Sequence, residues 1–224
     1  MVAICPPLYF PPLWYTSLLH HVDHFVLADT FRYRGQSFQN RSKLRNAHGT
    51  HWITIPLFGK PRGAPFHEVE IETKGRWREK HWRSFLYDYR TTMYFDFYKE
   101  TFRPFFEKDW ETLADCTCRS VALQVELFGI DASLTRASAI NGRPGTLPEI
   151  LDALQADTLV FPTDKEVPST LDIQSEPFRY DEPEYRQNFE GFEPGVTGLD
   201  LLFNYGREAP RYLARGEIAS GSRN

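Results

Sequence analysis

The segment FVLADTFRYRGQSFQNRSKLRN, residues 25–46, decides how the fold is interpreted. It begins with an apolar run that ends at Asp29 and continues into a stretch rich in Arg, Gln, Asn and Lys. A short apolar run bounded by polar residues is typical of a buried strand in a parallel sheet, and the end of such a strand lies at the edge where α/β proteins place ligands. The segment therefore predicts both a fold class and the place of a site.

The rest of the chain repeats this pattern of short apolar runs, and most of the runs alternate with helical spacing. Residues 13–22 have helical spacing after a proline-rich loop, and TLPEILDALQAD begins with the capping-box pair Thr146 and Glu149. The alternation favours an α/β fold with a mostly parallel, Rossmann-like sheet. We expect that sheet to contain residues 2–5, 25–28, 134–139 and 158–161.

Two additions to this sheet are expected. Residues 38–45 and HWITIPL, residues 51–57, are predicted to pair as a β-hairpin across the NAHGT turn. Residues 76–129 carry aromatic and aliphatic residues at helical spacing and predict a helical insertion. We therefore expect one α/β domain over residues 1–207, closed by the helix GLDLLFNYG, and a flexible tail over residues 208–224.

Composition limits the classes of function. The chain has 224 residues, 41% of them hydrophobic and 25% charged, and a formal net charge of -4, so neither nucleic acid nor an anionic membrane is an expected partner. No apolar run is long enough to span a bilayer, and three cysteines do not make a disulfide framework. We expect a cytoplasmic protein with a small, phosphate-bearing substrate. The sequence does not identify a cofactor or an oligomeric state, and both stay open.

The cations after Asp29 are the first candidate site. In a hairpin, Gln39, Arg41, Lys43 and Arg45 share one face, so several of them can converge on a phosphate or carboxylate. The alternative is a solvated edge strand whose charges prevent edge-to-edge pairing.

The histidines and cysteines give weaker signals. His81 has Lys80 and Arg78 as neighbours, which would lower its pKa and suit it to act as a base, although a packed histidine is the alternative. His20 and His24 have a spacing that can hold zinc on a helix, but no metal-site motif surrounds them and we predict no metal site. The Cys-x-Cys at residues 116–118 lies in a helical stripe, where thiols act as small apolar groups.

Several motifs taken together resemble the WbqC-like family of bacterial proteins, many of which are encoded with surface-polysaccharide genes. The motifs are PPLYFPPLWY, DHFVLADTFRYRGQSFQNRSKLR, HWITIPL, RWREKHWRSFLYDYRTTMYFDFY and LLFNYG, in the order and spacing of the family. The chain departs from the family at four positions. Pro6 replaces Gln, Trp14 replaces Gly, Ala28 replaces an acid and Ser42 replaces Asn.

The resemblance implies a cytoplasmic transferase that moves an amino-acid or acyl group onto a nucleotide-linked sugar. The first strand, proline loop and Asp-ending second strand are also similar in outline to nucleotidyltransferases, although the His-x-Gly-His signature is missing. A non-catalytic binding or scaffold protein of the same pathway is the alternative. We predict that one electropositive cleft gathers His81 and Asp29 as catalytic residues with Gln39, Asn40, Arg41, Lys43 and Lys80 as substrate-binding residues.

Overall fold

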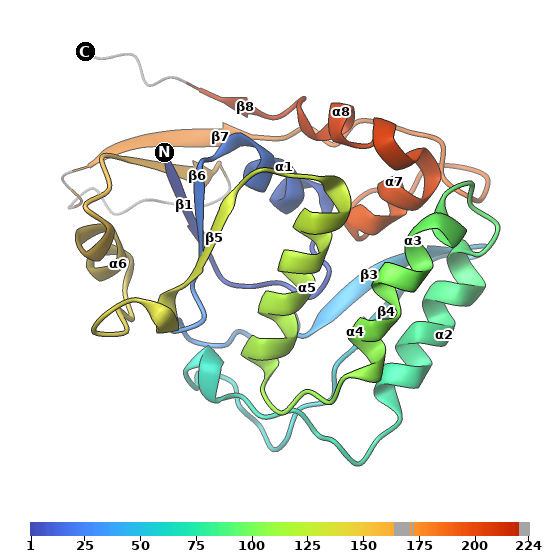
Figure 1. The fold of residues 1–224 in the computed structure, drawn as a ribbon, viewed down its shortest axis with the longest axis horizontal. Coiled ribbons are helices and arrows are strands. Elements are labelled where there is room, and N and C mark those ends of the chain that lie inside the picture. The colour runs from blue at the N-terminus through green and yellow to red at the C-terminus, as the bar shows by residue number, and fades with distance from the viewer. Residues whose placement is uncertain (164–170, 172, 220–224) are drawn as a thin grey trace.

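One mostly parallel sheet organises the structure, a computed structural model that describes residues 1–163, 171 and 173–219 (Figure 1). Its strand order is β5-β2-β1-β6-β7-β8, and β8 pairs with β7 in the antiparallel direction while the other neighbours are parallel. The predicted fold class is confirmed. The strands are β1 (Val2–Cys5), β2 (His24–Leu27), β5 (Ser133–Arg136), β6 (Thr158–Pro162), β7 (Gln174–Arg179) and β8 (Glu217–Ile218).

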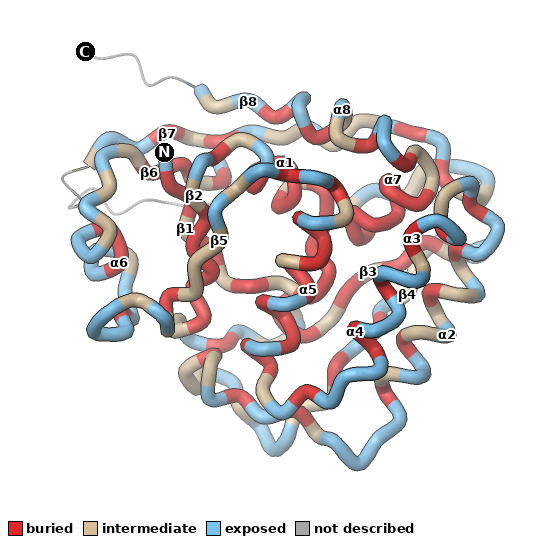
Figure 2. Tube along the Cα trace, in the orientation of Figure 1, coloured by how far each residue is buried: buried red, intermediate tan, exposed pale blue. Residues whose placement is uncertain are grey.

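Side chains of the central strands alternate between two apolar layers. Ala3 of β1 and Phe25 of β2 pack toward α1 (Leu13–His21) and α5 (Leu113–Phe128), whereas their neighbours Val2 and Val26 pack toward α6 (Leu147–Leu154). This alternation is the two-residue period of a strand covered on both faces. The central strands are buried in Figure 2, and each fully buried large aliphatic or aromatic side chain contributes about 1.5–3 kcal/mol.

The predicted hairpin forms a separate two-stranded sheet. β3 (Arg41–Asn46) pairs with β4 (Gly49–Thr54), so the strands are shorter than the predicted 38–45 and 51–57. Leu44 and Ile53 are buried on the face toward α2 (Trp77–Tyr89), because His51 of the same face bonds Asp88 of that helix. The hairpin is therefore anchored to the helical part of the chain and lies apart from the main sheet.

The helices between residues 77 and 128 enclose a core of aromatic rings. α2 is followed by α3 (Phe95–Phe102), α4 (Pro104–Glu107) and α5. Ring centroids of Phe85 and Phe102 lie 4.7 Å apart, and Phe10 of the proline-rich loop lies 5.2 Å from Phe102. Edge-to-face pairs of this kind stabilise a core beyond simple burial. The proline-rich loop after β1 is thus packed against the aromatic core through Phe10. No helix in the described ranges is long and apolar enough to cross a membrane.

Some local expectations differ from the structure. The third predicted strand ends at Arg136, and the chain continues as a 3₁₀ turn over Ala137–Ala139. β7 was not predicted, because QSEPFR is polar and contains a proline. The capping box at Thr146 is confirmed.

The predicted flexible tail is also different in its described part. After α7 (Gly198–Tyr205) and the 3₁₀ turn Gly206–Glu208, residues 210–213 form α8 (Pro210–Leu213), and Leu213 is fully buried. Two hydrophobic anchors, Ala209 and Leu213, and the pairing of β8 with β7 hold this segment. Residues 220–224 of the predicted tail lie outside the described residues. The single domain over residues 1–207 stays a prediction.

Candidate functional site

Asp29 lies at the carboxyl edge of the main sheet. β2 ends at Leu27, and two residues later the Asp29 side chain is fully buried, with 0% of it exposed. Because β2 runs parallel to both β1 and β5, this is the edge at which α/β sheets bind ligands. The predicted position of Asp29 at this edge is therefore observed.

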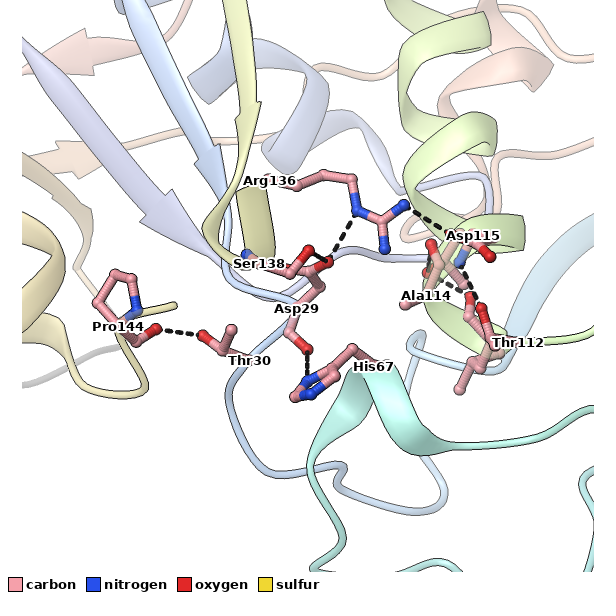
Figure 3. Close-up of polar contacts among 11 residues, drawn as sticks. Asp29, Thr30, His67, Thr112, Ala114, Asp115, Arg136, Ser138 and Pro144 are labelled. Atoms are coloured by element: carbon pink, nitrogen blue, oxygen red, sulfur yellow. Dashed lines mark hydrogen bonds and ion pairs between the residues drawn. The ribbon is translucent and has the colours of Figure 1, made fainter. Parts of the chain in front are cut away.

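Two residues at the end of β5 and just after it, Arg136 and Ser138, bind the Asp29 carboxylate (Figure 3). Arg136 pairs with Leu27 across the sheet, and its Nε donates to Asp29 Oδ2 at 2.8 Å. Ser138 donates twice, from its backbone N to Oδ1 at 2.8 Å and from its Oγ to Oδ2 at 2.6 Å. A buried carboxylate is costly unless it is paired and hydrogen-bonded, so these bonds offset the burial of Asp29.

The Arg136 guanidinium also joins the sheet to α5. Its Nη1 donates to Asp115 Oδ1 at 2.6 Å, and Asp115 lies in the first turn of α5, which Thr112 caps. Burial alone would lower the pKa of Arg136, but hydrogen bonds to Asp115 and Asp29 raise that pKa above its ordinary value. Side-chain exposure is 34% for Arg136 and 50% for Asp115, so this outer pair meets solvent. Among the described residues, Arg136 Nη2 has no hydrogen-bond partner.

A cavity of about 530 Å³ lies between β5, the start of α5 and the segment before that helix. Leu27, Leu134 and Trp110 give it apolar walls. Its charged lining residues are equally divided between the two signs, which differs from the electropositive cleft that the sequence predicts. They are Lys108, Asp109, Glu111, Asp115, Arg119 and Arg136.

A histidine that the sequence pattern does not single out lies beside the cluster. The backbone N of His67 donates to the Asp29 carbonyl oxygen at 2.8 Å, and its Nδ1 lies 3.2 Å from the same oxygen. If Nδ1 carries the proton and donates it to that carbonyl, Nε2 is left as an acceptor. His67 is part of the 3₁₀ turn Phe66–Glu68, and its side chain is 28% exposed.

Gln39 and Asn40, predicted to bind substrate, are used inside the protein. Gln39 Oε1 accepts a hydrogen bond from the Arg34 backbone N at 2.6 Å, and Asn40 Nδ2 donates to the Ile55 carbonyl at 3.1 Å. Both side chains are nearly buried, with 4% and 9% of each residue exposed. These contacts shape the chain leading into β3.

Arg41 and Lys43 lie on the outer face of the hairpin. The guanidinium carbon of Arg41 lies 4.1 Å from the ring centroid of Trp52, and Lys43 Nζ donates to the Pro194 carbonyl at 3.3 Å. Lys80 is exposed on α2. Neither Arg41 nor Lys43 contacts Asp29 in the described part of the chain.

His81 is buried in the helical part of the protein. Only 5% of it is exposed, Nδ1 lies 3.0 Å from the Tyr9 hydroxyl, and the Trp77 ring packs 5.1 Å away. Burial lowers the pKa of His81 to about 3, so the ring is neutral as predicted, but burial and not Lys80 or Arg78 is the main cause.

The predicted cleft is not assembled by contacts in the structure. Asp29 bonds Arg136 and Ser138, and none of the hydrogen bonds or ion pairs of the described residues joins it to His81. Arg41 lies on the hairpin face that points away from α2, the helix that carries His81. Ligand binding by the predicted residues stays a prediction.

The two remaining candidates from the sequence are the histidine pair and the Cys-x-Cys pair. His20 lies in the last turn of α1 while His24 belongs to β2, so the two do not share a helix, and no group of three metal-ligand side chains occurs in residues 1–163, 171 and 173–219. Cys116 and Cys118 are buried in α5, as predicted, and burial raises the pKa of both thiols.

The similarity to known proteins extends over nearly the whole chain. A sequence model described as the WbqC-like protein family matches residues 6–212. The uncharacterized protein Rv1507c of Mycobacterium tuberculosis is 30% identical over 226 residues, which cover 95% of this chain and 96% of that protein. No solved structure matched the chain.

Proposed function

The chain belongs to the WbqC-like protein family, and we propose that it is a cytoplasmic transferase of surface-polysaccharide assembly that moves an amino-acid or acyl group onto a nucleotide-linked sugar. The observation that carries the proposal is the 530 Å³ cavity at the carboxyl edge of the sheet, bounded by the Arg136 guanidinium that Asp29 and Asp115 hold in place. Ligands of α/β proteins bind at this edge, and a fixed cation there is suited to transfer chemistry.

Arg136 is the residue best placed to contact the transferred group. Two of its nitrogens are committed to carboxylates, which fixes the plane of the guanidinium, and Nη2 keeps its hydrogens for a ligand. A donor fixed before the reaction can stabilise negative charge on an acyl oxygen without further rearrangement. Asp29 is accordingly a positioning residue, since it is fully buried and reaches the cavity only through Arg136.

The balanced lining suits an uncharged or zwitterionic reacting group better than a bare dianion. In acyl transfer, the acceptor amine or hydroxyl forms a bond to the acyl carbon, and the donor's leaving group departs with the electron pair of the broken bond. The proton lost by the acceptor passes to a base. Glu111 suits that role because it is exposed in the cavity, and no ion pair engages it within the described ranges. His81 is enclosed by aromatic rings, which makes its predicted part as the base less favourable.

A ligand screen tests the proposal. Thermal shift with nucleotide sugars, nucleotides and acyl-coenzyme A should reveal a ligand, and one present at a hundred times its dissociation constant adds about 2.7 kcal/mol of stability. Glu111→Gln and Arg119→Gln change the cavity lining, and both should reduce transfer of a radiolabelled acyl or aminoacyl group.

Arg90→Gln is the matched control, because Arg90 is an exposed arginine at the end of α2, outside the cavity. It should leave binding and transfer unchanged. Ligand binding without transfer would favour the non-catalytic alternative, and no ligand among these classes would reject the proposal.

A further inference from the structure

The outer face of the hairpin is cationic and carries an exposed tryptophan. The strand register places the side chains of alternate residues on one face, and its strand residues include no carboxylate, although Glu182 from the later chain lies near Lys43 and Arg45 is buried. Trp52 is 41% exposed and lies directly across from Lys43. The residues of this face are Arg41, Lys43, Arg45, Thr50, Trp52 and Thr54.

Arg41 and Phe38 frame the Trp52 ring. The Arg41 guanidinium carbon lies 4.1 Å from the centroid of that ring, and the Phe38 ring meets it edge-on with centroids 4.9 Å apart and planes at 65°. Arg45 on the same face is not free to join them, because Gln187 and Glu190 accept its hydrogen bonds. The remaining groups are one aromatic ring and two cations, of which Arg41 donates one hydrogen bond to Gln36 and Lys43 donates one to the Pro194 carbonyl, so each ammonium or guanidinium keeps further hydrogens for a ligand.

The chain before β3 is shaped to hold Arg41 over the tryptophan. Gln36 has φ of 57°, a left-handed conformation that non-glycine residues seldom adopt, and its carbonyl accepts from Arg41 Nη2. Ser37 Oγ donates to the Arg34 carbonyl at 2.7 Å and fixes the same turn. These contacts keep the Arg41 side chain beside the Trp52 ring.

The resting position of Arg41 leaves one donor unsatisfied. Its Nε is buried and has no hydrogen-bond partner among the described residues. A buried donor without an acceptor destabilises the arrangement, and a charged donor does so more strongly. An anionic ligand that draws the guanidinium off the ring would satisfy Nε and expose the aromatic face at the same moment.

We propose that the hairpin face formed by Trp52, Arg41 and Lys43 binds a nucleoside diphosphate. The planar base takes the stacking position on Trp52 that Arg41 now occupies, and the two phosphates accept hydrogen bonds from Arg41 and Lys43. Tryptophan stacks on any base, and arginine matches phosphate in a two-pronged geometry, so the face meets both halves of such a ligand. This site is separate from the cavity at Arg136 and goes beyond the proposed function.

Calorimetric titration with adenosine diphosphate tests the site, with adenosine and inorganic pyrophosphate as partial probes. Adenosine diphosphate should bind at least about tenfold more tightly than either partial probe. Trp52→Ala should weaken it by about tenfold or more and should affect adenosine but not pyrophosphate. Arg41→Gln should show the reverse selectivity, with a loss of about tenfold for the diphosphate.

Two control variants distinguish binding at the hairpin face from binding in the cavity and from a general effect of lost surface charge. Arg34→Gln changes an exposed arginine of the same loop, and Arg136→Gln changes the cavity, so both should bind adenosine diphosphate as the wild type does. Trp52→Thr, which suits a strand, replaces Trp52→Ala if that variant does not fold. Unchanged binding in the Trp52 and Arg41 variants, or pyrophosphate binding as tight as that of the diphosphate, overturns the inference. Loss of binding in Arg136→Gln alone would place the diphosphate in the cavity and also overturn it.

Discussion

Asp29 and Asp200 are two fully buried carboxylates with different partners. Asp29 meets a guanidinium and two donors of Ser138, whereas Asp200 receives a 2.8 Å hydrogen bond from the Tyr185 hydroxyl on Oδ2. Asp200 Oδ1 has no hydrogen-bond partner within the described part of the chain. Burial raises the pKa of Asp200 to about 7, although hydrogen bonds from Tyr185, Tyr89 and Gln187 and the charge of Arg45 act to lower it.

The difference separates a site from a structural contact. The Arg136 partner of Asp29 is 34% exposed and lines a cavity, and under the proposed function the buried carboxylate holds this cation where a ligand can reach it. The partner of Asp200 is itself buried, and the pair joins α7 to the loop that carries Tyr185. Burial alone does not mark a functional carboxylate. We propose that the exposure of its partner does in this protein.

The largest expected effect is the pH dependence that Asp200 imposes. Its folded pKa of about 7 lies above the reference value of 3.8, so the folded state binds the proton more tightly, and stability is lost as pH rises from about 4 through about 7. The loss is up to about 4 kcal/mol. Asp200→Asn should remove it, as measured by urea unfolding at several pH values from 4 to 8.

His81 makes stability change with pH in the opposite direction to Asp200. The difference in unfolding free energy between Asp200→Asn and the wild type at each pH is therefore the quantity to measure. Its folded pKa of about 3 lies below the reference value of 6.5, and stability is therefore lost as pH falls below about 6.5. Parallel curves for wild type and Asp200→Asn would show that Asp200 is ionised at neutral pH in the folded state.

The second largest change in unfolding free energy is expected when Asp29 loses its cationic partner Arg136. Arg136→Met leaves a buried carboxylate without its charge partner and should destabilise the protein by about 3 kcal/mol in urea unfolding at pH 7. Asp29→Asn in the same chain should recover part of that loss, because no uncompensated charge remains. A double variant as unstable as the sum of the single variants would show that the pair is not coupled.

The buried cysteines should have a smaller effect. Replacement of Cys116 and Cys118 with Ala removes two small apolar groups from α5 and should cost about 2 kcal/mol in total; although Cys118 lines the cavity, its thiol adds only apolar surface there, so transfer activity should be kept. Thermal unfolding and the transfer assay check both parts. Inactivity of a folded double variant would assign the thiols a chemical role.

The smallest effect on stability is expected for a residue of the cavity wall. Arg119 pairs with Glu126 in an exposed position, so Arg119→Gln should change the free energy of unfolding by less than about 1 kcal/mol. Its effect on ligand binding should be larger than its effect on stability. The reverse result would make the cavity lining a structural feature.

The sequence predicted those parts of the fold that local patterns determine. The apolar run before Asp29 predicted β2, and the capping pair at Thr146 predicted the start of α6. The polar strand β7 could not be predicted, because its burial comes from neighbours far along the chain.

Of the residues in the candidate site, only Asp29 could be predicted from the sequence. Asp29 could be placed because it ends a strand, but its partner Arg136 is 107 positions away, and the parallel pairing of β2 with β5 brings the two together. Local sequence does not distinguish Arg136 from an ordinary strand residue, and its place in a predicted parallel strand is the available signal. His67 gives no such signal, because its contact with the Asp29 carbonyl is made in a short turn.

A crystal structure with the best ligand from the screen tests the central claim most directly. The cavity at the carboxyl edge should hold that ligand, with one of its oxygen atoms about 2.7–3.2 Å from Arg136 Nη2 and with the bonds from Arg136 to Asp29 and Asp115 intact. An acyl or aminoacyl group bound elsewhere while the cavity stays empty, or a ligand that displaces Arg136 from Asp29, would contradict the account, whereas a nucleotide on the hairpin face would not.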